Sequence, residues 1–458
     1  MNIKNITSGL NLSSREGSTP FEVLSMTFFI PMCSLLLWTL AGRVRISSGL
    51  FQAIEVSLLN IILLLGLTLF ENKLQLVFSV LFIVIIITFY IVVYQYSSTP
   101  HMKYVLRYIN SKEVVKQDIN KSFVEGYRGH LFLATAICIL AVDFNSFPAR
   151  FAKTETFGWS IMDAGVGSFI VVHGLCSSQG RGLTAKHLKK CFMSSFPLFL
   201  LGVVRLVATN AVGYHKVVPE YGLHWNFFFT LAFTKVICYS VLSITNIPSG
   251  ILAIASMTVH QLLLSKLDLL TLILSEDRET FFKANKEGIC SLLGFVSLYF
   301  AGVQLGSVVW KKGLKLSEYK NILLNLCAIG AIGWVLMYLC HHSIQPISRR
   351  MANLPYCIWV VSLTSLQIAL HLCQELIIII LSRLLKNNYS DFLLWKAINY
   401  NGLFYFLLAN LLTGLVNLSI DTNNSSHLKS FVILITYLTI LSVSVITAHK
   451  KSIQLKFW

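Results

Sequence analysis

The chain has 458 residues, of which 55% are hydrophobic and only 12% are charged, and its formal net charge is +17. Soluble domains carry about 25% charged residues, so this composition excludes a soluble globular protein and indicates a polytopic membrane protein. The basic residues are spread over many short loops. That distribution excludes a nucleic-acid-binding surface and is typical of loops on the cytoplasmic side of a membrane.

Apolar runs of about twenty residues predict an all-α polytopic membrane protein with about thirteen transmembrane helices. These are expected near residues 22–41, 51–70, 74–96, 130–147, 160–176, 192–213, 225–246, 249–266, 288–309, 321–341, 356–381, 395–419 and 428–448. Between a polar tail at 1–20 and a second tail at 449–458, residues 21–448 are expected to form a single multi-pass domain.

The distribution of Lys and Arg favours a luminal N-terminus and a cytosolic C-terminus, because positive charge gathers on the cytosolic side. With this orientation the sequons at Asn5, Asn11 and Asn423 lie on the luminal side, where glycosylation is possible. The first twenty residues are polar, so we expect the first apolar run to be a retained helix rather than a cleaved signal.

The ten Cys form no CxxC pair and no Cys/His cluster at metal-ligand spacing, so no metal site is expected. Most of them lie inside apolar segments, where Cys behaves as a small buried hydrophobic residue. The sequence contains no P-loop, no HExxH, no GxSxG and no visible internal repeat.

Residues 141–159 leave one apolar segment and lead into another, and they carry an unusual set of polar groups. Asp143 and Lys153 lie ten residues apart across Pro148, which ends or kinks a helix and lets the chain fold back. An Asp at this boundary is a candidate general base, and the Lys could stabilise an oxyanion. On spacing alone, a structural ion pair remains the alternative. Other candidate ligands, which could equally cap the next helix, are Arg150, Thr154 and Glu155.

Three further polar stretches fall on the same predicted luminal side. They supply candidate sugar-binding side chains (His224, Trp225, Asn226), candidate phosphate-binding side chains (Arg349, Arg350, with Asn353 nearby) and a polar stripe on one helix (Asn410, Asn417). The guanidinium fork suits phosphate oxygens. Snorkelling of the arginines, an aromatic belt and interhelical hydrogen bonds remain the structural alternatives.

The stretch AVDFxxFPxRFAKTExxGxSxMDxGVGSF, from Ala141, resembles the signature of the PIG-W type of inositol acyltransferase, which acts in glycosylphosphatidylinositol (GPI) anchor assembly. The run NGLFYFLLANLLTGLVN from Asn401, and the stretches around Tyr221 and Arg349, also resemble this family, in a fungal-like member. Together these segments cover most of the chain.

This resemblance implies transfer of a fatty acyl group, typically palmitoyl, from acyl-CoA to the inositol 2-hydroxyl of glucosaminyl-phosphatidylinositol. The reaction would take place in the endoplasmic reticulum membrane, with acyl-CoA as co-substrate and without a metal or other cofactor. It also implies that Asp143 activates the hydroxyl and that Lys153 steadies the carbonyl oxygen or the base.

Three other functions stay open from the residues alone. A lipid or solute transporter, or a flippase, would also carry intramembrane charges, but it predicts an inverted repeat and broken helices in both halves. A different membrane acyltransferase class would use an intramembrane His with an Asn, for which His341, His342 and His371 are available. A non-catalytic assembly subunit would not need Asp143 or Lys153.

Overall fold

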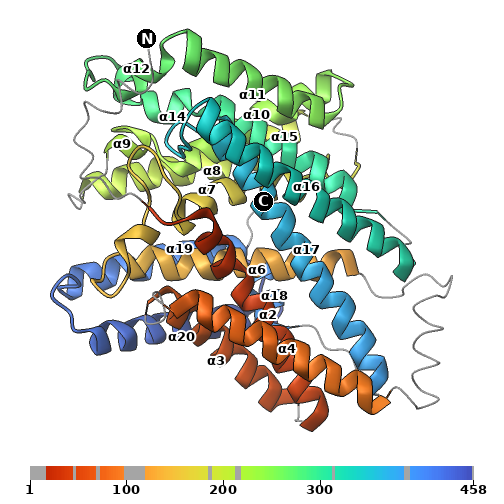
Figure 1. Ribbon diagram of the computed structural model, residues 1–458. Helices are drawn as coiled ribbons and strands as arrows, with labels where there is room; N and C mark the ends of the chain where they lie inside the picture. Colours follow the sequence, from red (N-terminus) through yellow and green to blue (C-terminus); the bar gives the residue numbers. More distant parts are fainter. Residues whose placement is uncertain are drawn as a thin grey trace.

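The structure of the protein is a computed structural model that describes residues 17–44, 48–68, 73–96, 119–183, 188–211, 218–311, 315–385 and 392–455. Within these ranges it contains helices and turns but no strand, which confirms the all-α prediction (Figure 1). The helices are α2 (Pro20–Val44), α3 (Ser48–Leu67), α4 (Leu74–Tyr96), α6 (Ile119–Ala141), the 3-10 helix η2 (Ala149–Phe151), α7 (Ile161–Leu175), α8 (Leu188–Ala211), α9 (Val218–Tyr221), α10 (Phe227–Ile244), α11 (Ser249–Lys266), α12 (Leu269–Leu274), α13 (Phe281–Ala284), α14 (Lys286–Cys290), α15 (Leu292–Val309), α16 (Leu316–Ser343), α17 (Leu354–Leu385), α18 (Leu393–Tyr400), α19 (Gly402–Ser419) and α20 (His427–Lys450).

The described part of the chain has ten helices that are long and apolar enough to cross a membrane. Residues 76–91 and α7 form shorter apolar helices, and α11 is not among the ten. The polytopic class is therefore confirmed, while the count of thirteen spans, their orientation and the two tails stay predictions. The sequons at Asn5 and Asn11 lie outside the described residues, and Asn423 is exposed in the turn after α19.

The largest difference from the expected spans is at α6. A span was expected at 130–147, but the helix runs from Ile119 to Ala141. Charged residues at Glu125 and Arg128 lower the local hydropathy, yet Phe123 and Tyr127 on the same stretch of helix are buried against other helices. Packing of this amphipathic face, which hydropathy does not register, extends the helix.

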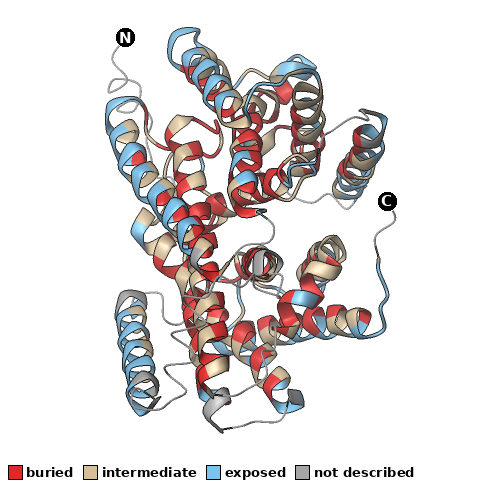
Figure 2. Cartoon of the chain, turned by 90° about the vertical axis from the view of Figure 1, so that its right-hand side faces the viewer, coloured by how far each residue is buried: buried red, intermediate tan, exposed pale blue. Residues whose placement is uncertain are grey.

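Helix α17 is the centre of the packing. It contacts α2, α6, α7, α11, α15 and α16, and in Figure 1 it runs between a green group of helices (α10, α11) and a red-to-orange group (α2, α3, α4). In Figure 2 the buried residues gather on the central helices, and exposed residues line the outer side of the peripheral ones. On α4, α8 and α16 the exposed residues are largely apolar, as expected for helix faces that meet lipid.

Helices α7 and α15 meet with their backbones in contact, because two glycines face each other's helix. A Cβ atom on Gly174 would lie 2.2 Å from the Tyr299 carbonyl oxygen, and one on Gly302 would lie 2.1 Å from the Val171 carbonyl oxygen. Small residues permit this close approach in membrane helices. The contact fixes α7, whose first turn carries side chains of the site described below.

Candidate active site

The turn that follows α6 holds the predicted site, and its apolar residues explain its shape. Phe144, Phe147 and Phe151 are buried in the core and anchor the chain between Ala141 and η2. Pro148 is extended (φ −62°, ψ 128°), which ends the first part of the turn and begins η2. The polar residues of the stretch therefore project from a backbone that the aromatic anchors hold in place.

Asp143 lies half-buried just after the end of α6. Its Oδ2 accepts a hydrogen bond of 2.8 Å from the Asn417 side-chain amide, which comes from the last turn of α19. Burial raises the pKa of the Asp143 carboxyl above its ordinary value, and the bond from Asn417 opposes that rise. The structure thus brings together two residues that were predicted from separate segments.

Lys153 is paired with Glu220, an acidic residue of α9 that was not among the predicted site residues. The Lys153 ammonium lies 2.6 Å from Glu220 Oε1, with 34% and 19% of the two side chains exposed. Burial raises the pKa of Glu220, but the positive charges around it, Lys153 first, hold that pKa below its ordinary value. Neither a hydrogen bond nor an ion pair joins Asp143 to Lys153 within the described ranges.

A buried ion pair fixes the other side of the turn. Arg349 Nε donates to Asp163 Oδ1 at 2.6 Å, and both side chains are almost fully buried. Asp163 Oδ2 accepts from both the backbone N–H and the hydroxyl of Thr154. The Ser160 hydroxyl caps α7 by accepting from the Asp163 N–H at 3.0 Å. Arg349 also lies 3.9 Å from Glu220, so this cluster continues into the Lys153 pair.

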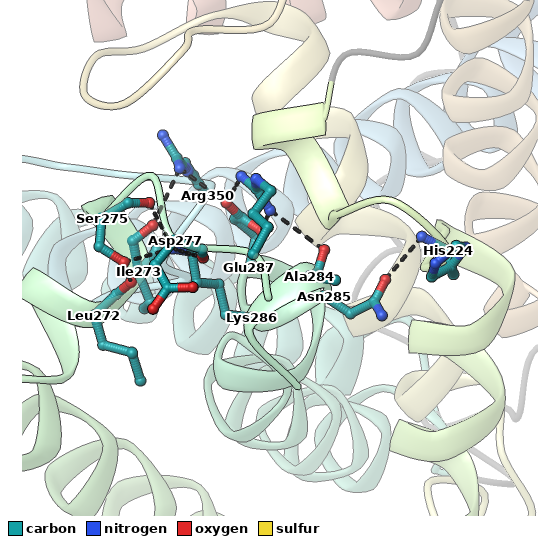
Figure 3. Close-up of polar contacts among 11 residues, drawn as sticks. His224, Leu272, Ile273, Ser275, Asp277, Ala284, Asn285, Lys286, Glu287 and Arg350 are labelled. Atoms are coloured by element: carbon teal, nitrogen blue, oxygen red, sulfur yellow. Dashed lines mark hydrogen bonds and ion pairs between the residues drawn. The ribbon is translucent and has the colours of Figure 1, made fainter. Parts of the chain in front are cut away.

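Arg350 belongs to a second buried cluster, shown in Figure 3. Glu287, which is fully buried, pairs with Arg278 at 2.6 Å and with Arg350 at 3.0 Å. Lys286 is also buried and donates to the carbonyl and hydroxyl oxygens of Ser275. These ion pairs and hydrogen bonds join α12 and α14 to the loop before α17, and they give each of the charged side chains a polar partner.

The predicted sugar-binding stretch is built around Asn285. Its side-chain oxygen accepts from the backbone N–H of His224 at 2.8 Å (Figure 3). The same oxygen accepts from the backbone N–H of Trp225 at 3.1 Å. The Trp225 indole donates to Thr230. Asn226 caps α10 and donates to the Gly202 carbonyl at 2.9 Å. The His224 side chain is exposed and stacks on Phe281.

The remaining predicted residues have varied surroundings. Arg150 pairs with Glu22 of α2 at 3.1 Å. Glu155 is exposed. Asn353 is fully buried and holds its own loop by donating to Gln345 and Pro346. The Asn410 amide donates to a carbonyl of its own helix. These contacts leave their role in substrate binding a prediction.

The histidines named by the rival acyltransferase class lie in separate surroundings. His371 is buried in the middle of α17, with its ring 5.8 Å from that of His130. His341 accepts from the Ile347 N–H and its ring contacts that of Trp159 at a tilt, and the His342 ring packs edge-on against His341. No group of three or more His, Cys, Asp or Glu is placed to hold a metal ion in the ranges that the structure describes.

Sequence comparisons cover most of the chain. Residues 10–448 match the family model described as GWT1. A Bos taurus protein named glucosaminyl-phosphatidylinositol-acyltransferase PIGW is 35% identical over 366 residues, which cover 71% of this chain and 72% of the bovine one. GPI-anchored wall transfer protein 1 of Saccharomyces cerevisiae is 33% identical over 451 residues, covering 89% of this chain and 90% of the yeast one.

A third relative is the phosphatidylinositol-glycan biosynthesis class W protein of Dictyostelium discoideum, which is 33% identical over 394 residues, covering 76% of this chain and 78% of its own. These matches confirm the resemblance that the motifs had indicated. The chain belongs to the GWT1 family.

Proposed function

We propose that this protein is an acyltransferase of GPI-anchor biosynthesis in the endoplasmic reticulum membrane. The donor is acyl-CoA, typically palmitoyl-CoA, and the acceptor is the inositol 2-hydroxyl of glucosaminyl-phosphatidylinositol. The name of the bovine relative supports the reaction and the acceptor. The observation that carries the proposal is a half-buried carboxylate, Asp143, held by Asn417 at the end of a membrane-spanning helix.

Asp143 is the proposed general base. A general base must be ionised, and a pKa raised by burial makes it a stronger proton acceptor once it is ionised. The inositol hydroxyl gives its proton to Asp143 as its oxygen attacks the thioester carbonyl carbon. The tetrahedral intermediate collapses by breaking the carbon–sulfur bond, and the CoA thiolate takes the proton back from Asp143.

Lys153 is the proposed electrostatic group. Its side chain is one-third exposed, so the ammonium can turn from Glu220 towards an oxyanion that forms beside it. In the resting protein, Glu220 keeps this cation in place and neutralised. Among the other candidate residues, Arg349, Thr154 and Asn353 then form the walls of the acceptor site, with their positions fixed by buried hydrogen bonds.

The test is an acyl-transfer assay in membranes that lack the endogenous activity. Radiolabelled glucosaminyl-phosphatidylinositol and palmitoyl-CoA are supplied, and the lipids are separated by chromatography. Asp143→Asn should lower the rate about 10²- to 10⁴-fold, and Lys153→Met about 10²- to 10³-fold. Matched controls are Asp421→Asn, an exposed carboxylate after α19, and Lys283→Met, a surface lysine, and both should retain the wild-type rate.

The outcomes separate the alternatives. Transfer that survives both Asp143→Asn and Lys153→Met would keep the activity but make the pair structural, and His341, His342 and His371 would be substituted next. A folded wild-type protein that converts no acceptor with any acyl-CoA would overturn the proposal and favour a transporter.

A further inference from the structure

One cation in the membrane-spanning part of the chain stands out by its surroundings. Arg205 lies on α8, six residues before the end of the helix at Ala211, which is about 9 Å along the axis. Arg205 is exposed, and the neighbouring Val204 and Val207 are exposed too. The guanidinium forms no hydrogen bond or ion pair with any residue that the structure describes. Arg205 therefore lies on the lipid-facing side of α8, close to its end.

The contacts of α8 place Arg205 beside the candidate site. The amide of Asn226, one of the candidate substrate-binding residues, donates to the carbonyl of Gly202, one helical turn before Arg205, and so ties α8 to the start of α10. Burial raises the pKa of Glu220, yet nearby positive charges, Arg205 among them, hold that pKa below its ordinary value. The guanidinium is thus close enough to act on the carboxylate that pairs with Lys153.

The charges of this cluster do not balance. Among the residues that the structure describes, it contains three cations (Lys153, Arg349, Arg205) and two carboxylates (Glu220, Asp163), which leaves one positive charge in excess. Arg349 and Lys153 each have a carboxylate within hydrogen-bond distance. The excess positive charge is therefore that of Arg205, on the side of the cluster that faces the membrane. A charge within an apolar span costs free energy unless an anion or water compensates it.

We propose that Arg205 binds the phosphodiester of the lipid acceptor where the headgroup passes from the membrane towards Asp143. This inference rests on the proposed function and names one residue that would recognise its substrate. The guanidinium donors match phosphate oxygens in geometry and in charge. Arg349 and Arg350 are less available for this task, because buried Asp163 and Glu287 already hold them.

The test separates recognition of the headgroup phosphate from a general attraction to phospholipid. The purified full-length protein in lipid nanodiscs is titrated with two water-soluble probes, glucosaminyl-inositol 1-phosphate and glucosaminyl-inositol without the phosphate. In the wild type the phosphate should tighten binding about 10- to 100-fold. Arg205→Gln should reduce that ratio to about one, and Arg205→Lys should keep part of it. Lys189→Gln, at the other end of α8, is the control and should keep the wild-type ratio.

The acyl-transfer assay on the same preparations gives a second readout. Arg205→Gln should raise the KM for glucosaminyl-phosphatidylinositol and leave the KM for palmitoyl-CoA unchanged. If the wild type acylates its acceptor and Arg205→Gln keeps the full phosphate ratio, Arg205 only anchors α8 in the membrane and this inference is wrong. A wild type that neither acylates the acceptor nor binds either probe would instead overturn the proposed function itself. Arg205→Lys serves as the folded variant if the Gln variant proves unstable.

Discussion

Two glutamates at the same end of the molecule each pair with two cations, but they differ in how fully they are enclosed. Glu287 is completely buried between Arg278 and Arg350, and neither arginine has more than 22% of its side chain exposed. Glu220 is 19% exposed, and its closest partner, Lys153, is 34% exposed. Glu287 sits among short helices that it ties together, whereas Glu220 sits beside the turn that carries Asp143.

This difference in enclosure suggests different roles: Glu287 supports the fold, and Glu220 belongs to the candidate site. A buried ion that loses its partner destabilises the fold strongly, because its charge is left without compensation. A partly exposed pair contributes little to stability, because water replaces the lost partner. A cation that must turn towards a reacting group belongs in the second kind of environment. The same Glu→Gln substitution at the two positions therefore gives the sharpest test.

The largest effect is expected for Glu287→Gln. The amide leaves Arg278 and Arg350 without a counter-charge in a buried site, so the free energy of unfolding should fall by about 3–5 kcal/mol. Thermal unfolding of the purified protein in detergent measures this loss. Lys283→Met, which removes a surface ion pair of the neighbouring segment, is the control and should leave the midpoint unchanged. Equal midpoints for Glu287→Gln and the wild type would contradict the scaffold role.

Glu220→Gln should show the opposite pattern. We expect a thermal unfolding midpoint close to that of the wild type. The kcat should fall about 10-fold, because Lys153 loses its charged partner. Glu220→Ala should lower kcat further, since the amide oxygen of Gln can still accept from Lys153. Both are measured by acyl transfer at saturating substrates. A large loss of stability with unchanged kcat would place Glu220 with Glu287 as scaffold.

A smaller, pH-dependent effect is expected for Asn417→Leu. The hydrogen bond from Asn417 lowers the pKa of Asp143, so its removal lets that pKa rise further. A general base must be ionised, and the acid limb of the rate profile should therefore move to higher pH, by roughly 0.5–1 unit. At pH values well above the acid limb, the rates of the variant and the wild type should converge. Ser419→Ala, on the same helix turn, should leave the profile in place.

The smallest effect is expected for Ser160→Ala, which removes the cap of α7. Its hydroxyl accepts from the Asp163 N–H, and loss of such a cap costs about 1 kcal/mol. Ser426→Ala removes the corresponding cap from α20, where the hydrogen bond is 3.4 Å long and exposed, and should cost less. Thermal unfolding compares the two. A greater loss for Ser426→Ala would show that the Asp163 turn is not a structural support.

Apolar runs predicted most of the helices, because lipid selects for them over about twenty consecutive residues. They failed where neighbouring helices replace lipid, as at the start of α6, and at the short helices α12, α13 and α14. The sequence predicted which residues belong to the site, but not which of them contact one another. Asp143, Lys153 and Arg349 were each found from local motifs, but their partners Asn417, Glu220 and Asp163 lie on other elements.

Glu220 shows why the pairing was not predicted. A single acidic residue in a loop of a basic chain has no local pattern that marks it, and only the three-dimensional contact with Lys153 gives it a role. The same holds for Arg205, a charge on α8 that the local sequence does not connect to the site. Long-range ion pairs thus carry information that periodicity and spacing do not contain.

The bond between Asp143 and Asn417 also bears on biosynthesis. The two residues are 274 positions apart in the chain. At about 5–20 residues per second, a ribosome needs roughly 15–55 s to pass from one codon to the other. Throughout that interval the nascent protein has its carboxylate but not the amide that orients it. Under the mechanism proposed above, newly inserted helices would remain catalytically incomplete until α19 joins the bundle, and unfinished chains would not consume lipid substrate.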